Sequence, residues 1–183
     1  MNDLAARQLL ALREVGGTLE AAGIDYWVFG GWAVDLHAGR VTRAHDDVDL
    51  AVWHHDLSVI GSLLEAQGWR HAPTGDENGG TGYERAGVRL ELTFLARDRE
   101  GIYTPLREGR ASWSEETFAD DVRELMGTRA RVTAREPLAH GKSSPRADPE
   151  DASKDRADHL VLSELDPTEE LPNAPTERPA PSA

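Results

Sequence analysis

Two aspartates one residue apart, Asp47 and Asp49, begin a short apolar stretch that ends at Trp53. On a strand, side chains at i and i+2 share a face with their Cα atoms about 7 Å apart. Two carboxylates placed in this way can converge on a hard divalent cation such as Mg²⁺, which takes oxygen ligands and leaves room for substrate phosphates. We therefore predict a metal-binding pair, with Val48 facing the core and Asp46 facing away as a turn or capping residue.

A glycine pair, Gly30-Gly31, separates the strand-forming run Tyr26–Phe29 from a short predicted helix. Backbone without a Cβ lets a phosphate approach, and the free N–H groups at a helix start favour an anion. Taken alone, either a glycine pair or an Asp-x-Asp pair is common and uninformative. A strand, Gly-Gly, a helix and a second strand opening with Asp-x-Asp form a specific arrangement.

This arrangement resembles the polymerase-beta type of nucleotidyltransferase. Within that superfamily, the segments Gly-Gly-Trp-Ala-Val-Asp, Gly-Arg-Val-Thr-Arg and His-Asp-Asp-Val-Asp-Leu resemble the aminoglycoside 2''-adenylyltransferase family, with lincosamide nucleotidyltransferases as a looser match. The resemblance implies transfer of a nucleoside monophosphate, AMP being favoured, from a magnesium-bound triphosphate to a hydroxyl of a small acceptor. It also implies that Asp47 and Asp49 bind two Mg²⁺ ions and that Gly30 and Gly31 face the phosphates of ATP or another NTP.

The resemblance further implies a third carboxylate on a later strand, often the general base. Residues 88–95 alternate apolar and polar side chains, and Glu91 lies on the polar face. Related aminoglycoside enzymes usually carry Asp at this position, so Glu91 is interpreted as a metal ligand, a base, or a solvated strand residue without a role. Glu84 is the reserve candidate.

Basic residues around the motif have two interpretations. Arg40 and Arg43 flank the turn into the acidic strand, where they could bind the triphosphate or the aspartate pair, or simply neutralise nearby acids. In the later segment Lys154-Asp155-Arg156-Ala157-Asp158, which also resembles these transferases, Lys154 could reach a phosphate or form an i, i+4 surface pair. Lys142 is a further phosphate-binding candidate.

Other polar residues near the motif are expected to be structural. We predict that His45 makes a hydrogen bond inside the fold and that Asp35 bonds a neighbouring loop. His54 and His55 are interpreted as exposed loop residues, because no further His or Cys stands at a zinc-ligand spacing.

The expected fold class is α/β (α+β), a nucleotidyltransferase fold with a short mixed sheet flanked by helices. Residues 1–98 would form the catalytic core, 99–165 a small C-terminal part completing the site, and 166–183 a proline-rich disordered tail. Periodicity predicts the elements with these bounds: helices over 3–22, 32–38, 56–67, 112–127, 137–142 and 155–165; strands over 26–29, 48–53, 88–95 and 129–133; loops over 73–82 and 143–151.

Composition limits the partners of this 183-residue chain. Its formal charge of -13 disfavours nucleic acid, because binding a polyanion requires clustered basic side chains. No cysteine is present, which excludes thiolate chemistry. The sequence has neither a secretory leader nor an apolar run of membrane-spanning length, so we expect a soluble cytoplasmic monomer or homodimer without membrane contact.

The sequence therefore favours a magnesium-dependent nucleotidyltransferase that modifies a small molecule, with an aminoglycoside-type antibiotic as the preferred acceptor. Two alternatives stay open. One is the same chemistry on a lincosamide, another metabolite or a macromolecule, as in a toxin. The other is a nucleotide-binding module without catalysis.

Overall fold

The computed structural model describes residues 3–73, 78–143 and 147–165. Its central feature is a mixed sheet in the strand order β3-β4-β5-β2-β1-β9-β8, extended beyond the end of β5 by β6 and β7. Strands β2 and β5 are parallel, as are β1 and β9, and every other pair is antiparallel. The strands are β1 (Tyr26–Phe29), β2 (Val48–Trp53), β3 (Arg70–His71), β4 (Gly80–Arg85), β5 (Val88–Asp98), β6 (Gly101–Pro105), β7 (Arg110–Trp113), β8 (Asp121–Leu125) and β9 (Thr128–Val132).

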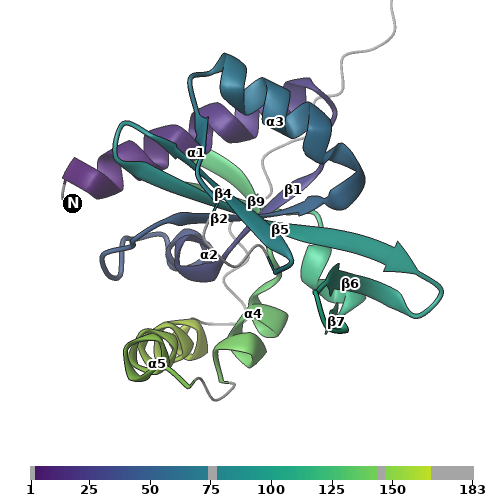
Figure 1. The fold of residues 1–183 in the computed structure, drawn as a ribbon. Coiled ribbons are helices and arrows are strands. Elements are labelled where there is room, and N and C mark those ends of the chain that lie inside the picture. The colour runs from purple at the N-terminus through teal and green to yellow at the C-terminus, as the bar shows by residue number, and fades with distance from the viewer. Residues whose placement is uncertain (1–2, 74–77, 144–146, 166–183) are drawn as a thin grey trace, which may run out of the picture.

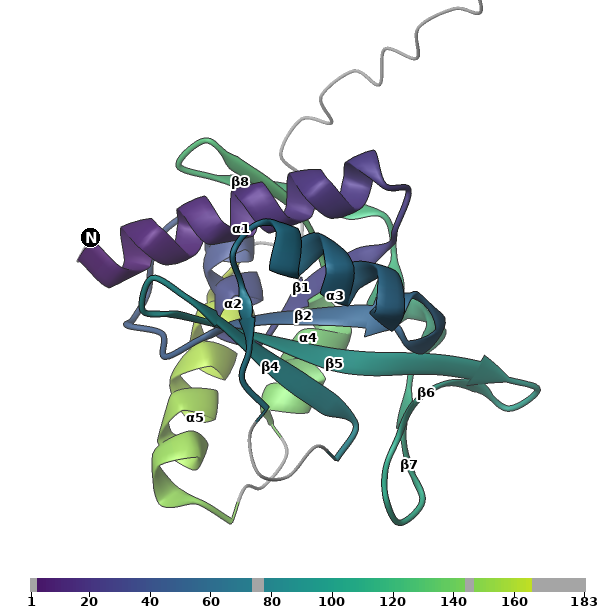
Figure 2. The same ribbon diagram turned by 45° about the horizontal axis from the view of Figure 1, so that its top comes forward.

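Helices lie on both sides of this sheet. Figure 1 shows α1 and α3 together on one side, with α4 and α5 on the other. The turned view in Figure 2 shows the β6–β7 hairpin projecting away from the helices. The helices are α1 (Asp3–Ala21), α2 (Gly30–Ala38), α3 (Leu57–Ala66), α4 (Arg135–Lys142) and α5 (Pro149–Glu164), with short 3-10 turns η1 (His54–Asp56) and η2 (Glu115–Phe118). The expectation of a mixed sheet flanked by helices is confirmed.

Alternation along the strands divides the core into two clusters. Val28 and Leu50 belong to the larger cluster, which includes the buried faces of α1 and α3. Trp27 and Ala51, one position away on the same strands, belong to a smaller cluster with Leu95 and Ile102. Because neighbouring residues of a strand face opposite sides, Asp49 and Glu91 share the face of the smaller cluster.

The helix predicted over 112–127 is wrong. Residues 121–125 form β8, which makes a hairpin with β9 in which Leu125 pairs with Thr128. The connecting residues Met126 and Gly127 both have positive φ, 52° and 76°. This is the backbone of a type I′ hairpin turn, so the glycine that resembled a helix stop closes a hairpin instead.

Other parts of the prediction also differ from the structure. Strand β4 begins at Gly80, inside the predicted loop 73–82. Helix α5 begins at Pro149 rather than 155, because the Asp148 side chain accepts hydrogen bonds from the N–H groups of Glu150 and Asp151. Strands β3, β6 and β7 were not predicted.

Two further expectations concern the ends of the chain and the membrane. The predicted tail, 166–183, lies outside the described residues. Within the described part of the chain, none of the helices has the length and apolar character needed to cross a membrane.

Candidate active site

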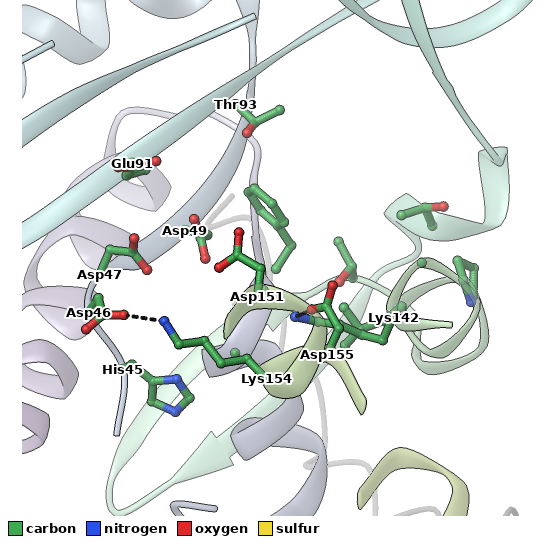
Figure 3. A pocket seen from close by; sticks show the side chains of 18 of the residues that line it. His45, Asp46, Asp47, Asp49, Glu91, Thr93, Lys142, Asp151, Lys154 and Asp155 are labelled. Atoms are coloured by element: carbon green, nitrogen blue, oxygen red, sulfur yellow. Dashed lines mark hydrogen bonds and ion pairs between the residues drawn. The ribbon is translucent and has the colours of Figure 1, made fainter. Parts of the chain in front are cut away.

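The two parallel strands β2 and β5 bring three carboxylates together. Asp49 and Glu91 are direct partners in the register of the two strands, and Asp47 stands two residues before Asp49. One carboxylate oxygen from each residue lies within 4.8 Å of the others. Figure 3 shows the three side chains gathered at one side of the cavity. The structure thus brings together the predicted carboxylates.

Burial and the repulsion of neighbouring carboxylates raise the pKa of both aspartates. Burial, followed by the charges of Asp47 and Glu91, raises the pKa of Asp49 to about 8. Burial and the charges of Glu91 and Asp46 also raise the pKa of Asp47. Three converging carboxylate oxygens that repel one another are a donor set that suits a hard divalent cation, so the residues fit Mg²⁺.

The glycine pair makes room for the side chains of this site. Gly30 has φ of +67°, and a Cβ built on it would overlap Oδ2 of Asp49. A Cβ on Gly31 would overlap the ring of His45 and the guanidinium of Arg43. Both glycines line the cavity at the start of α2, where Phe29 supplies no side-chain cap. The site therefore requires glycine at both positions, and the uncapped helix start offers N–H groups to an anion.

His45 and Asp35 form the buried hydrogen-bonded pair that the sequence predicted as structural. His45 Nε2 lies 2.6 Å from Oδ2 of Asp35, and both residues are buried. The other oxygen of Asp35 accepts hydrogen bonds from the backbone and hydroxyl of Thr42. Gln8 on α1 donates to the carbonyl of His45 at 3.0 Å. These contacts fix the loop that leads from α2 into β2.

Arg43 pairs with a carboxylate of α5. Its Nε and Nη2 donate to Oδ1 and Oδ2 of Asp158 at 2.8 and 2.9 Å. Lys142 Nζ lies 2.8 Å from both Asp158 and Asp155. Burial alone would raise the pKa of Asp158, but the hydrogen bonds from Arg43 and Lys142 lower it below its ordinary value. Both cations line the cavity, yet each is already committed to a carboxylate.

Lys154 and Asp46 both line the cavity and form an ion pair with each other. Lys154 Nζ lies 2.9 Å from Asp46 and 2.9 Å from Glu150, as Figure 3 shows for the first pair. The expectation that Asp46 faces away from the site is therefore wrong, because this exposed residue also lines the cavity. Arg40 is exposed and is not among the described residues that line it.

Arg89 is a site neighbour that the sequence reasoning missed. Its Nε donates to Oε1 of Glu91 at 2.7 Å, and its Nη1 lies 3.3 Å from Glu84. The reserve candidate Glu84 thus contacts Arg89 and is absent from the described lining of the cavity. The signal was available, since Arg89 stands two residues before Glu91 and so shares its strand face.

The cavity around these groups has a volume of about 550 Å³. Its described lining combines six carboxylates, three lysine or arginine side chains and a remainder of histidine, threonine, glycine and apolar residues. The carboxylates are Asp46, Asp47, Asp49, Glu91, Asp151 and Asp155, and the cations are Arg43, Lys142 and Lys154. Elsewhere in the described chain no other group of three potential ligands converges in this way, and His54 and His55 are exposed as expected.

Comparison with known proteins identifies the family. The family profile described as aminoglycoside-2''-adenylyltransferase matches residues 11–158. The chain belongs to this family. Curated 2''-aminoglycoside nucleotidyltransferases from Klebsiella pneumoniae and Escherichia coli are 32% identical over 63 residues, which is 34% of this chain and 36% of each relative. The matched part thus spans about a third of the length of these relatives.

Solved structures confirm the fold of this member of the aminoglycoside-2''-adenylyltransferase family. The structure of ANT(2'')-Ia in complex with adenylyl-2''-tobramycin has a TM-score of 0.65 at 19% identity, covering 85% of this chain and 90% of that one. Lincomycin-bound LnuA, a lincosamide antibiotic adenylyltransferase, has a TM-score of 0.67 at 17% identity, covering 89% and 99%. The predicted resemblance to both groups is confirmed, and the fold is that of a nucleotidyltransferase.

Proposed function

We propose that this protein transfers a nucleoside monophosphate, AMP in the first instance, from a magnesium-bound NTP to a hydroxyl of an aminoglycoside antibiotic. The observation that carries the proposal is the convergence of Asp47, Asp49 and Glu91 beside the uncapped start of α2. Membership of the aminoglycoside-2''-adenylyltransferase family supports the reaction and the class of acceptor.

The arrangement suits phosphoryl chemistry. Asp47 and Asp49 would hold Mg²⁺, two ions in the fullest form of the proposal, which supplies charge neutralisation for the triphosphate and the leaving pyrophosphate. Gly30 and Gly31 present backbone N–H groups beside the same carboxylates, where a phosphate oxygen can accept them. Lys154 would leave Asp46 and bind a phosphate when the nucleotide enters. Its ion pair with Asp46 is half exposed and therefore contributes little stability.

Glu91 is proposed to activate the acceptor hydroxyl. It is the direct strand partner of Asp49, so a hydroxyl bound beside the metal pair would lie within its reach. Arg89 holds one oxygen of Glu91 and fixes the direction of the carboxylate. The alternative role of Glu91, as a third metal ligand, uses the same geometry.

The charge of the cavity favours a cationic acceptor. Each of the three cations in the described lining already has a carboxylate partner. The remaining acidic groups attract a polycation by simple Coulomb attraction, and an aminoglycoside carries several ammonium groups. ANT(2'')-Ia, whose fold this chain shares, was solved with an adenylylated tobramycin.

The test is a panel of acceptors incubated with Mg-ATP and, separately, Mg-GTP. We expect pyrophosphate release with one or more aminoglycosides and a product heavier by one nucleoside monophosphate in mass spectrometry. Chelating the magnesium should abolish both signals. Product from lincomycin alone would replace the aminoglycoside by a lincosamide, and nucleotide binding without transfer to any acceptor would favour a binding module.

A further inference from the structure

Two arginines near the site hold carboxylates in different ways. Arg43 makes a complete fork with Asp158, in which Nε and Nη2 donate to the two carboxylate oxygens at 2.8 and 2.9 Å. Arg89 makes only half of such a fork with Glu91. Its Nε donates to Oε1 at 2.7 Å, whereas Nη2, on the same edge of the guanidinium, is buried without a hydrogen-bond partner. Oε2 of Glu91 therefore receives no hydrogen bond from Arg89.

The half fork leaves a buried donor unpaired, and a complete fork would give that donor a partner. A buried N–H without an acceptor costs stability, and a bidentate pair between a guanidinium and a carboxylate is the stronger arrangement. Nη2 of Arg89 lies over Gly82 on β4, where a Cβ would come within 2.9 Å of it. Gly82 is the strand partner of Glu91, so Nη2 lies beside the carboxylate that it does not bind. Another contact must hold the guanidinium in this position.

Glu84 provides that contact. It is the strand partner of Arg89 in the pairing of β4 with β5, and its Oε1 lies 3.3 Å from Nη1 of Arg89. Nη1 is the guanidinium nitrogen that takes no part in a fork made by Nε and Nη2. The other oxygen of Glu84 lies 2.7 Å from Nη2 of Arg70 on β3. Glu84 thus pulls Arg89 away from the second oxygen of Glu91.

The active site needs an oxygen of Glu91 that no guanidinium holds. One oxygen of this residue lies within 4.8 Å of oxygens of Asp47 and Asp49. A metal ligand and a general base both act through a free lone pair on a carboxylate oxygen. A complete fork with Arg89 would direct both oxygens of Glu91 toward the guanidinium. The half fork instead orients the carboxylate and leaves one oxygen for the site.

We infer that Glu84 is a positioning residue of the active site, which holds Arg89 in the half fork and so keeps one oxygen of Glu91 free. The inference rests on the proposed function, because it takes Glu91 as a member of the site. Glu84 is absent from the described lining of the cavity and acts through Arg89 alone.

The test replaces Glu84 by methionine, which has a similar length and lacks the charge and the acceptor oxygens. A crystal structure of Glu84→Met should show Nη2 of Arg89 bound to Glu91 in a complete fork. We expect kcat to fall roughly tenfold, a part of the about 10²- to 10⁴-fold that a general base contributes, with the KM of the acceptor unchanged. The melting temperature should not fall, because the lost ion pair is partly exposed and Nη2 gains a partner.

Two further variants separate positioning from a general effect of charge. Arg70→Met removes the exposed partner of Glu84 on β3 and should leave kcat unchanged. In an Arg89→Met background, Glu84→Met should cause no further loss of kcat, because no guanidinium is left to complete the fork. A direct effect of the charge of Glu84 on the site would persist in that background.

Several outcomes would overturn the inference. They are a half fork that persists in the crystal structure of Glu84→Met, an unchanged kcat, a loss confined to the KM of the acceptor, or an equal loss in the Arg89→Met background. If the parent modifies no acceptor, the proposed transferase function fails, while the crystal structure still decides whether Glu84 maintains the half fork.

Discussion

Burial, and after it the charges of Asp47 and Glu91, disfavour the ionised form of Asp49 in the folded protein. Its pKa of about 8, against an ordinary 3.8, means that the folded protein holds a proton there more tightly than the unfolded chain does. The contribution of this group to folding is therefore fully present at acidic pH and is lost as the pH rises from about 4 to about 8.

Asp49→Asn should remove this pH dependence. In metal-free protein we expect the variant to melt increasingly above the parent as the pH is raised from about 4 to about 8, reaching a gain of at least about 1 kcal/mol in unfolding free energy. Saturating Mg²⁺ should stabilise the parent and not the variant. The measurement is thermal melting over this pH range with and without Mg²⁺. A difference in melting temperature that stays constant with pH would contradict the raised pKa of Asp49.

The close approach of Gly30 to Asp49 can be tested by comparing alanine substitutions at Gly30 and Gly39. Both have positive φ, +67° and +65°, so alanine strains the backbone at either position by about 1 kcal/mol. Only at Gly30 would the new Cβ also overlap Asp49, since nothing lies near the Cβ position of Gly39. We expect Gly30→Ala to be the more destabilising in denaturant unfolding and to weaken Mg²⁺ binding, which Gly39→Ala should leave unchanged. Equal losses would argue against the close approach.

At the scale of elements, Asp158 joins three segments. It ties α5 to the loop before β2 through Arg43 and to α4 through Lys142. Asp158→Ala should cost about 2–4 kcal/mol of unfolding free energy, because it leaves the partly buried Arg43 without its carboxylate and removes one of the two partners of Lys142. Lys154→Ala, which removes an exposed pair from the same helix, should cost much less, because exposed ion pairs contribute little to stability. Chemical denaturation checks both, and a small loss for Asp158→Ala would show that α5 is held by its apolar contacts instead.

The sequence predicted helices and strands correctly where the hydrophobic periodicity and the residues at the ends of the element indicate the same structure. The strand that carries Glu91 was predicted from alternation, whereas the parallel pairing that sets Glu91 opposite Asp49 is known only from the structure. Residues 112–127 failed because Gly127 satisfies both a helix end and a hairpin turn, and the pairing of β8 with β9 decides between them. The periodicity of a single sequence does not show which segments pair as strands.

Long-range contacts explain which site residues the sequence misplaced. Arg43 and Asp158 are 115 residues apart, and nothing in either local sequence indicates their pairing. The sequence left open whether Arg43 binds phosphate or neutralises an acid; in the structure it pairs with Asp158, and phosphate binding by Arg43 stays a prediction.

At the scale of the whole chain, the segment 166–183 is still a prediction from composition. It is rich in proline and poor in apolar residues, so it has little surface to bury against the rest of the protein. Truncation after Leu165 should change the melting temperature by less than about 2 °C and leave nucleotide binding unchanged. A larger loss of stability would show that the segment packs on the folded part.

The central claim is that Asp47, Asp49 and Glu91 form the metal site of a nucleotidyltransferase. The most direct test is the rate of magnesium-dependent pyrophosphate release, with an accepted aminoglycoside, by the parent and by Asp49→Asn. The account predicts a loss of at least about a hundredfold in kcat for the variant, because charge stabilisation by bound metal supplies several kcal/mol of barrier lowering. Its melting temperature should not fall, which separates lost chemistry from lost folding. A variant that turns over at the parent's rate would contradict the claim.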